Sequence, residues 1–206
     1  MSILRLLLTS NGFYTNEIKE QFLKLINGAT NDLNVAIITT ASPQKEKNRF
    51  AQKAKEDFRE MGFQNIDFID VEFDNVESLT NKDVIYINGG NPFKLLFHFK
   101  QSGADNILRQ LVSKNVVIVG VSAGAVLLGP NIKIVHFFTP QMDELNTKDF
   151  SALGLTEKLV FPHYDREDLF KDISGKTIED RLKEFEFLER CTITRLRDDE
   201  YITVQI

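Results

Sequence analysis

Short apolar runs recur along the chain and alternate with longer amphipathic stretches. The runs lack strict alternation of apolar and polar residues, a pattern typical of strands that helices bury on both faces of a sheet. They cover residues 3–9, 35–40, 66–71, 84–88 and 116–121. This order of β and α segments predicts an α/β fold: a doubly wound, mostly parallel sheet with helices on both faces.

The amphipathic stretches carry recognisable signals for the start of a helix. The first has a candidate N-cap at Thr15 or Asn16, and the second has Ser42 as N-cap with Pro43 at the first helical position. Both lie between predicted strands, so they predict helices that connect parallel neighbours.

The last sixteen residues follow another pattern. Two short β-rich runs flank Asp198, Asp199 and Glu200, which predicts a C-terminal β-hairpin antiparallel to the rest of the sheet. The chain shows neither an internal repeat nor a linker rich in Pro, Gly or Ser. We therefore expect a single domain over residues 1–206.

Composition narrows the class of protein. The chain has 206 residues and a net charge of −5, with basic residues dispersed among acidic ones, so nucleic acid is not an expected partner. No segment approaches the roughly 20 apolar residues of a membrane span. The single cysteine, Cys191, allows no internal disulfide, fits a reducing compartment and is expected to pack in the core. We expect a soluble, cytoplasmic protein.

The segment from Gly120 to Gly124 reads G-V-S-A-G and ends an apolar run. Small residues around Ser122 permit the tight strand-to-helix turn of a nucleophile elbow, and a helix that begins there would direct free N–H groups at the serine oxygen. The alternative is structural: Ser122 is an N-cap, and the glycines allow a helix to pack closely on the sheet.

A second glycine-rich turn, N-G-G-N-P-F, follows the run that ends at residue 88. Asn91 would cap the next helix, with Pro92 at its first position. Gly89 and Gly90 free the backbone for close approach, so their N–H groups could complete an oxyanion hole facing Ser122. A tight turn before a well-capped helix is the alternative.

Three histidines are candidates for a general base. His98 lies in an expected helix and His136 in an expected strand, where structural roles are favoured. His163 follows an apolar strand end and a proline, which places it in a loop at the edge of the site. The histidines show no metal-ligand spacing, and the glycines lack a dinucleotide or P-loop fingerprint. We expect no metal and no cofactor.

Four segments in this order resemble peptidase family S51, the dipeptidase E or α-aspartyl dipeptidase family: GGNPFKLL, GVSAGAVLLGPNI, SALGLTEKLVFPHYD and GKTIEDRLKEF. The resemblance runs from the first strand to the C-terminus. It implies a fold similar to class I glutamine amidotransferases and an acyl transfer to a serine, followed by hydrolysis. Ser122 would be the nucleophile and His163 the base, with the N–H groups of Gly90 and Ala123 as oxyanion donors.

The sequence offers four acids that could orient His163. Where the dipeptidases carry an aspartate, this chain has Phe137, Phe138 and Thr139. The candidates are Asp143, Asp165 beside the histidine, and two acids of the C-terminal hairpin, Asp198 and Glu200, in a region where relatives carry a glutamate.

The specificity region departs from the family as well. Aspartyl dipeptidases carry an arginine for the substrate aspartate where this chain has Ile178, so strict aspartyl specificity is not expected. Arg181 aligns with a second family arginine, and Arg166 is near in sequence. We expect Arg181, Gly89 and Asn91 to contact a small peptide substrate.

Two other functions remain possible. Amidotransferases use cysteine at the elbow, where this chain has Ser122, so a glutaminase is disfavoured. A non-catalytic protein that binds a peptide or amino acid on the same scaffold would explain Ile178. The joint presence of Ser122 and His163 favours the hydrolase, since a binding scaffold has no physical need for the pair.

Overall fold

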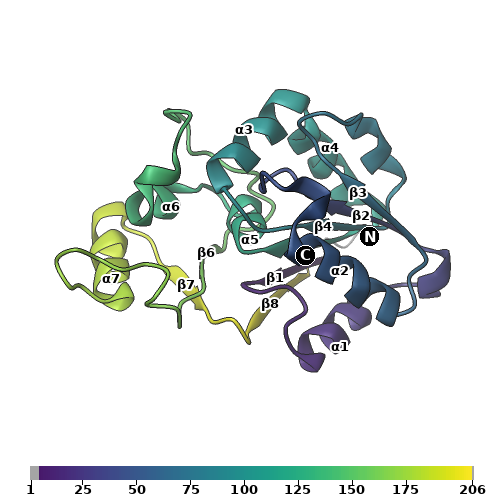
Figure 1. Ribbon diagram of the computed structural model, residues 1–206, viewed down its shortest axis with the longest axis horizontal. Coiled ribbons are helices and arrows are strands. Elements are labelled where there is room, and N and C mark those ends of the chain that lie inside the picture. The colour runs from purple at the N-terminus through teal and green to yellow at the C-terminus, as the bar shows by residue number, and fades with distance from the viewer. Residues whose placement is uncertain (1–4, 206) are drawn as a thin grey trace.

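The computed structural model describes residues 5–205, which form a six-stranded sheet, a separate two-stranded sheet and seven α-helices (Figure 1). The strands are β1 (Arg5–Thr9), β2 (Asn34–Ile38), β3 (Asn65–Ile69), β4 (Val84–Ile87), β5 (Val117–Val121), β6 (Leu159–Pro162), β7 (Ile193–Leu196) and β8 (Tyr201–Gln205). The helices are α1 (Asn16–Leu25), α2 (Arg49–Glu60), α3 (Pro92–Ser102), α4 (Ala104–Leu111), α5 (Ala123–Leu128), α6 (Lys133–Phe138) and α7 (Ile178–Glu189).

The six-stranded sheet has the order β3-β2-β4-β5-β1-β8. Its first five strands are parallel, and β8 alone is antiparallel, beside β1. The predicted doubly wound, mostly parallel sheet is confirmed. Residues 3 and 4 of the first predicted strand lie outside the described residues. Because parallel strands end at one edge, the loops after β1, β4 and β5 meet there.

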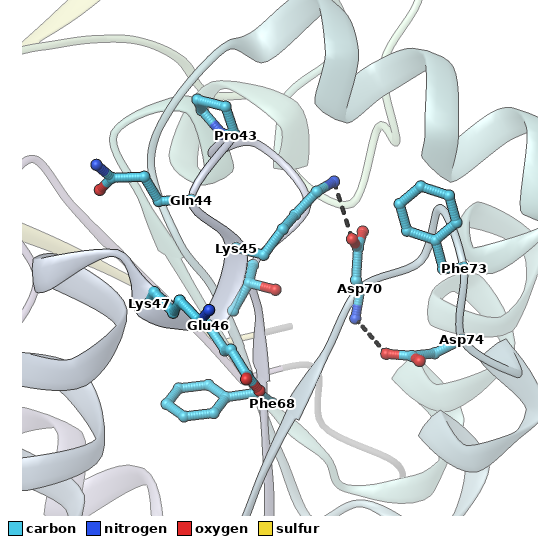
Figure 2. Close-up of a pocket in the computed structure, with 10 residues that line it drawn as sticks. Pro43, Gln44, Lys45, Glu46, Lys47, Phe68, Asp70, Phe73 and Asp74 are labelled. Atoms are coloured by element: carbon cyan, nitrogen blue, oxygen red, sulfur yellow. Dashed lines mark hydrogen bonds and ion pairs between the residues drawn. The ribbon is translucent and has the colours of Figure 1, made fainter.

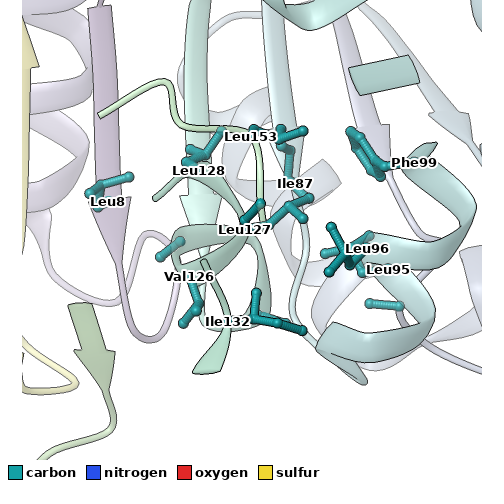
Figure 3. Close-up of a cluster of buried hydrophobic side chains, with 14 of the residues drawn as sticks. Leu8, Ile87, Leu95, Leu96, Phe99, Val126, Leu127, Leu128, Ile132 and Leu153 are labelled. Atoms are coloured by element: carbon teal, nitrogen blue, oxygen red, sulfur yellow. The ribbon is translucent and has the colours of Figure 1, made fainter. Parts of the chain in front are cut away.

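Each face of this sheet packs on its own group of helices. On one face, α1 and α2 cover an aromatic cluster that includes Phe13, Phe58 and Tyr86. On the other face, α3, α4 and α5 pack over aliphatic side chains of β1, β4 and β5, such as Leu8 and Ile87 (Figure 3). Burial on both faces explains why the strands read as continuous apolar runs.

The two C-terminal strands are present, but they join different sheets. β7 pairs in parallel with β6, whereas β8 pairs antiparallel with β1, so the expected hairpin pairing between them is absent. β8 instead adds to the free side of β1, where it finds five register partners and becomes the edge strand of the sheet. The turn between β7 and β8, residues 197–200, therefore bridges the two sheets.

Two local predictions were wrong. The N-cap of α2 is Asn48, whose side chain accepts from the amide nitrogens of Phe50 and Ala51 at 2.8 and 3.4 Å. Ser42 instead accepts from the Gln44 amide in a turn that precedes Lys45, a residue with φ of 50°. Second, His136 lies in helix α6 rather than in a strand, because the segment docks its apolar face on the core next to α7.

Strands β6 and β7 with helices α6 and α7 form an arm beside the main sheet, on the left in Figure 1. Charged side chains hold this arm together. Arg195 of β7 donates to Glu179 of α7 at 3.1 Å and to Glu186 of α7 at 2.5 Å, and Glu186 also accepts from the Ile193 amide at 2.7 Å. These contacts fix β7 against α7.

Candidate active site

Ser122 occupies the sharp turn between β5 and α5. Its backbone angles are φ 52° and ψ −112°, a conformation that L-residues rarely adopt and that marks stored strain. The Ser122 amide donates to the Thr9 carbonyl at 2.9 Å, and its side chain caps no N–H group of α5. The Ser122 side chain is therefore not used as an N-cap.

Close packing at this turn requires glycine. A Cβ added to Gly124 would lie 2.2 Å from the carbonyl oxygen of Ile87, and one added to Gly120 would lie 2.8 Å from the carbonyl oxygen of Gly124. Real atoms do not approach so closely, so α5 can lie against β4 only because Gly124 lacks a side chain, and against β5 only because Gly120 lacks one.

The loop after β4 lies directly beside the serine. A Cβ on Gly89 would meet Ser122 Cβ at 3.0 Å, and Gly90 has φ of 144° with the Ala41 carbonyl oxygen 2.3 Å from where its Cβ would be. Within residues 5–205, the amides of Gly90 and Ala123 have no hydrogen-bond acceptor. Asn91 caps α3 and donates to the Met142 carbonyl at 2.8 Å, so its side chain is already engaged.

His163 lies between Ser122 and Asp198. Its Nε2 is 3.0 Å from Ser122 Oγ, and its Nδ1 is 2.6 Å from Asp198 Oδ1. The His163 and Asp198 side chains are only 19% and 11% exposed, which limits competition from water for their hydrogen bond. The three side chains form one hydrogen-bonded chain from a carboxylate through an imidazole to a hydroxyl.

Further contacts hold the histidine and the aspartate in place. The buried hydroxyl of Ser10 accepts from the His163 amide at 3.0 Å and donates to the Leu196 carbonyl at 2.8 Å. Asp165 accepts from the Asp198 amide at 3.0 Å, and Arg166 donates to Asp198 Oδ2 at 3.4 Å. Ser10 was not predicted as a site residue. Its position directly after the first predicted strand, at the carboxyl edge of the sheet, could have indicated this role.

Three residues considered from the sequence lie elsewhere. Glu200 is exposed and accepts from the Arg197 amide at 2.9 Å, and Asp143 accepts from the Thr147 amide at 2.9 Å. Arg181 is buried, stacks on Phe138 and donates to the carbonyls of Phe138 and Phe170 at 3.1 and 2.9 Å. Contrary to the expectation from the sequence, Arg181 does not face the substrate site, because its guanidinium group donates to backbone carbonyls inside the arm.

The two other histidines and the cysteine pack against residues away from Ser122. His98 lies 3.7 Å from Glu72 through its Nε2, and His136 packs against Phe150 with ring centroids 4.8 Å apart. Cys191 is partly buried against the core, and burial raises the pKa of its thiol. Among residues 5–205, no three His, Cys, Asp or Glu side chains gather as a metal site requires.

Ser122 and His163 open into a cavity of about 930 Å³. It extends from the serine along the carboxyl edge of the sheet to the loop after β1 and the first turns of α2, and Gly89, Gly90 and Asn91 line it as well. A volume of this size accommodates a small organic ligand. Neither Arg181 nor Ile178 lines it.

A smaller cavity of about 630 Å³ shares Pro43 with the first (Figure 2). Lys45 reaches across it to Asp70 at 2.8 Å, and the Asp70 amide donates to Asp74 at 2.7 Å. Ser122, His163 and Asp198 do not line this second cavity. Lys45 also contacts Glu72 at 2.6 Å, so its charge is balanced by two carboxylates.

Fold and site together define the class: an α/β protein with a serine on a strand-to-helix elbow, in hydrogen-bond reach of a histidine held by an aspartate. The model of peptidase family S51 matches residues 6–205, so the chain belongs to this peptidase family.

Named relatives are peptidases too. The chain is 29% identical over 178 residues to an uncharacterized peptidase of Listeria monocytogenes, covering 82% of this chain and 84% of that one. It is 30% identical over 132 residues to peptidase E of Escherichia coli, covering 64% of this chain and 56% of that one. These relatives agree with the family in supporting a peptidase.

Solved structures share the fold. The crystal structure of a candidate peptidase E protein from Listeria monocytogenes superposes with a TM-score of 0.76 at 24% identity, covering 98% of this chain and 95% of that one. A peptidase from an acI-B1 actinobacterium gives a TM-score of 0.63 at 19% identity, with 84% and 74% of the chains covered. At these identities the likeness concerns the fold. No helix in the described part of the chain has the length and apolarity to cross a membrane.

Proposed function

We propose that the protein is a serine peptidase that hydrolyses small peptides through an acyl-enzyme on Ser122. The observation that carries the proposal is the continuous hydrogen-bonded chain Ser122–His163–Asp198, whose serine and histidine line the large cavity. A histidine whose Nδ1 is held by a carboxylate presents its Nε2 as a base to the serine hydroxyl. A structural role for the strained Ser122 would not require this chain.

In the first half-reaction, Ser122 Oγ attacks the carbonyl carbon of the peptide bond while His163 Nε2 takes the hydroxyl proton. The carbonyl oxygen becomes an oxyanion, which the free amides of Gly90 and Ala123 stabilise. His163 then gives its proton to the leaving nitrogen, the C–N bond breaks, and an ester on Ser122 remains. Asp198 stabilises the imidazolium and fixes its orientation throughout.

In the second half-reaction, water attacks the ester carbonyl and His163 takes a proton from it. The same two amides bind the second oxyanion. Collapse of this intermediate breaks the bond to Ser122 Oγ, and His163 returns the proton to the serine. The free acid leaves, and the site is restored.

Walls on several sides limit the substrate to a short peptide. The cavity is bounded by the loop after β1, the start of α2 and the loop that carries Met142.

We also propose that this activity takes place in the cytoplasm, because its reducing conditions suit the single free thiol, that of Cys191.

Peptide cleavage tests the proposal directly. Purified protein is incubated with dipeptides and tetrapeptides and the products are followed by mass spectrometry. We expect cleavage by the parent protein and by Ser113→Ala, a control at an exposed helix end, and a loss of about 10⁶-fold in kcat for Ser122→Ala. Cleavage that persists in Ser122→Ala would exclude Ser122 as the nucleophile.

A further inference from the structure

The cavity beside Ser122 has walls that suit one class of substrate. Building on the proposed peptidase activity, we propose that the cavity accepts a large uncharged side chain, aromatic or branched aliphatic, on the acyl residue of the peptide, and disfavours a carboxylate. The inference rests on three features: paired charges, aromatic walls and two unpartnered polar groups on its floor.

The cations that line the cavity already have acidic partners. Lys19 and Lys53 both contact buried Asp57 at 2.7 Å, and Lys94 contacts Glu144 at 2.9 Å. No arginine is among the described residues that line the cavity. A substrate carboxylate would have to compete with Asp57 or Glu144 for these lysines, or remain without a cationic partner.

Aromatic side chains supply much of the wall. Phe13 and Tyr86 are nearly buried, with ring centroids 5.5 Å apart, while Tyr14 and Phe50 line the same cavity and remain 62% and 51% exposed. Exposed aromatic rings beside a cavity gain burial when an apolar group packs on them. A phenyl or isobutyl group would bury these rings, whereas the side chain of aspartate would leave them exposed to solvent.

The floor carries two polar groups without protein partners. Tyr86 and Asn88 are 3% and 2% exposed, line the cavity, and make no side-chain hydrogen bond to any described residue. Two residues apart in extended chain, they lie on one face of the sheet. Burial, and then the charge of Asp57, raise the pKa of Tyr86, so its hydroxyl stays protonated and can donate.

Glycine at position 12 keeps the Tyr86 hydroxyl open to the cavity. A Cβ there would lie 2.4 Å from Tyr86 Oη. A ligand that displaces solvent from these two groups must complete their hydrogen bonds, because a desolvated polar group without a partner is unfavourable. Neutral atoms of a substrate, such as a peptide carbonyl or a phenol, fit a neutral hydroxyl and a neutral amide.

The first experiment compares kcat/KM for dipeptides with alanine as the second residue and Phe, Tyr, Leu or Asp as the first. We expect the three uncharged substrates to exceed Asp-Ala by at least about tenfold. Equal or faster cleavage of Asp-Ala would overturn the inference and leave the serine mechanism intact.

Two variants locate the preference in this cavity. Phe50→Ala should lower kcat/KM for Phe-Ala about tenfold while hardly changing that for Asp-Ala. Phe187→Ala, which removes an 84% exposed ring on α7, is the matched control and should change neither. Tyr86→Phe removes only an unpartnered hydroxyl and should lower kcat/KM for all uncharged substrates. Unchanged Phe-Ala cleavage in both cavity variants would contradict the assignment.

Binding separates this inference from the catalytic one. Calorimetric titration of Ser122→Ala protein with Phe-Ala and Asp-Ala measures affinity without turnover. Tighter binding of Phe-Ala would support the cavity assignment. If the parent protein then cleaved neither dipeptide, the peptidase mechanism would be rejected while the cavity assignment would stand. Equal affinities would overturn the cavity assignment whatever the parent protein cleaves.

Discussion

The Ser122 turn and the arm that carries His163 meet at one cavity, but they are held by different forces. Around Ser122 the backbone is held by close packing, through glycines at positions where any Cβ would collide with a carbonyl of an adjacent segment. In the arm, His163 and Asp198 depend on hydrogen bonds to distant residues, such as Ser10, 153 residues away from His163. The turn thus depends on close steric packing of its backbone, whereas the positions of the His163 and Asp198 side chains depend on polar contacts.

Because of this difference, substitutions in the two regions should act in different ways, on backbone geometry at the turn and on side-chain orientation in the arm. At the turn, an added methyl group distorts backbone geometry, because packed interiors have no spare volume. In the arm, loss of one polar atom is expected to keep the fold intact but to release the His163 imidazole from its orientation. The predictions that follow exploit this contrast.

Among residues that support Ser122, the largest effect is expected at the carboxylate of Asp198. Asp198→Asn should lower kcat about 10⁴-fold, since an amide cannot stabilise the imidazolium and favours the wrong tautomer of His163. Glu200→Gln, two residues along the same turn, should leave kcat unchanged because the Glu200 carboxylate accepts from the Arg197 amide and, within residues 5–205, makes no hydrogen bond to His163. Steady-state kinetics with circular dichroism checks both. Equal kcat values in the two variants would remove Asp198 from the mechanism.

A smaller loss is expected at the loop beside the serine. Gly90→Ala places a Cβ against the Ala41 carbonyl at φ of 144° and should displace the Gly90 amide, lowering kcat about 10²-fold. Gly154→Ala is the control: its φ is also positive, at 60°, but nothing lies within 4 Å of the new atom. It should lower stability slightly and leave kcat unchanged. Undiminished turnover in Gly90→Ala would exclude that amide as an oxyanion donor.

The smallest effect concerns the charges that hold the arm. Hydrogen bonding by Arg195 lowers the pKa of Glu186 below that of an unfolded glutamate, so the pair stabilises the fold above about pH 4.3 and loses this contribution as the pH falls through the folded pKa. Glu186→Gln should therefore lower Tm by about 3 °C at pH 7, for a pair worth about 1 kcal/mol.

Thermal melts at pH 7 and pH 3 test this sign. At pH 3 the difference between parent and variant should shrink, because protonation removes the charge of Glu186 in the parent as well. A difference that is as large at pH 3 as at pH 7 would show that the arm does not rely on this ion pair.

The same contrast explains what could be predicted from the sequence. Apolar runs predicted the parallel sheet, and the short motif around Ser122 predicted a tight turn, because both depend on neighbouring residues. The partner of His163 could not be chosen among four acids, because Asp198 is 35 residues away and reaches the imidazole only when β7 joins β6.

Local signals also misled in two places. Arg181 matched a family arginine by alignment, but burial against Phe138 turns its guanidinium into the arm. The apolar segment containing His136 resembled a strand, since a run of six residues has no periodicity that separates strand from buried helix. In both cases, tertiary packing decided.

Covalent labelling of Ser122 tests the central claim most directly. The intact protein is treated with a fluorophosphonate, which reacts with serine hydroxyls activated by a neighbouring base, and the adduct is located by peptide mass spectrometry. The account predicts one adduct, on Ser122, formed rapidly in the parent protein and at least about 10³-fold more slowly in His163→Ala. No adduct on Ser122, or equal labelling rates in the two proteins, would contradict it.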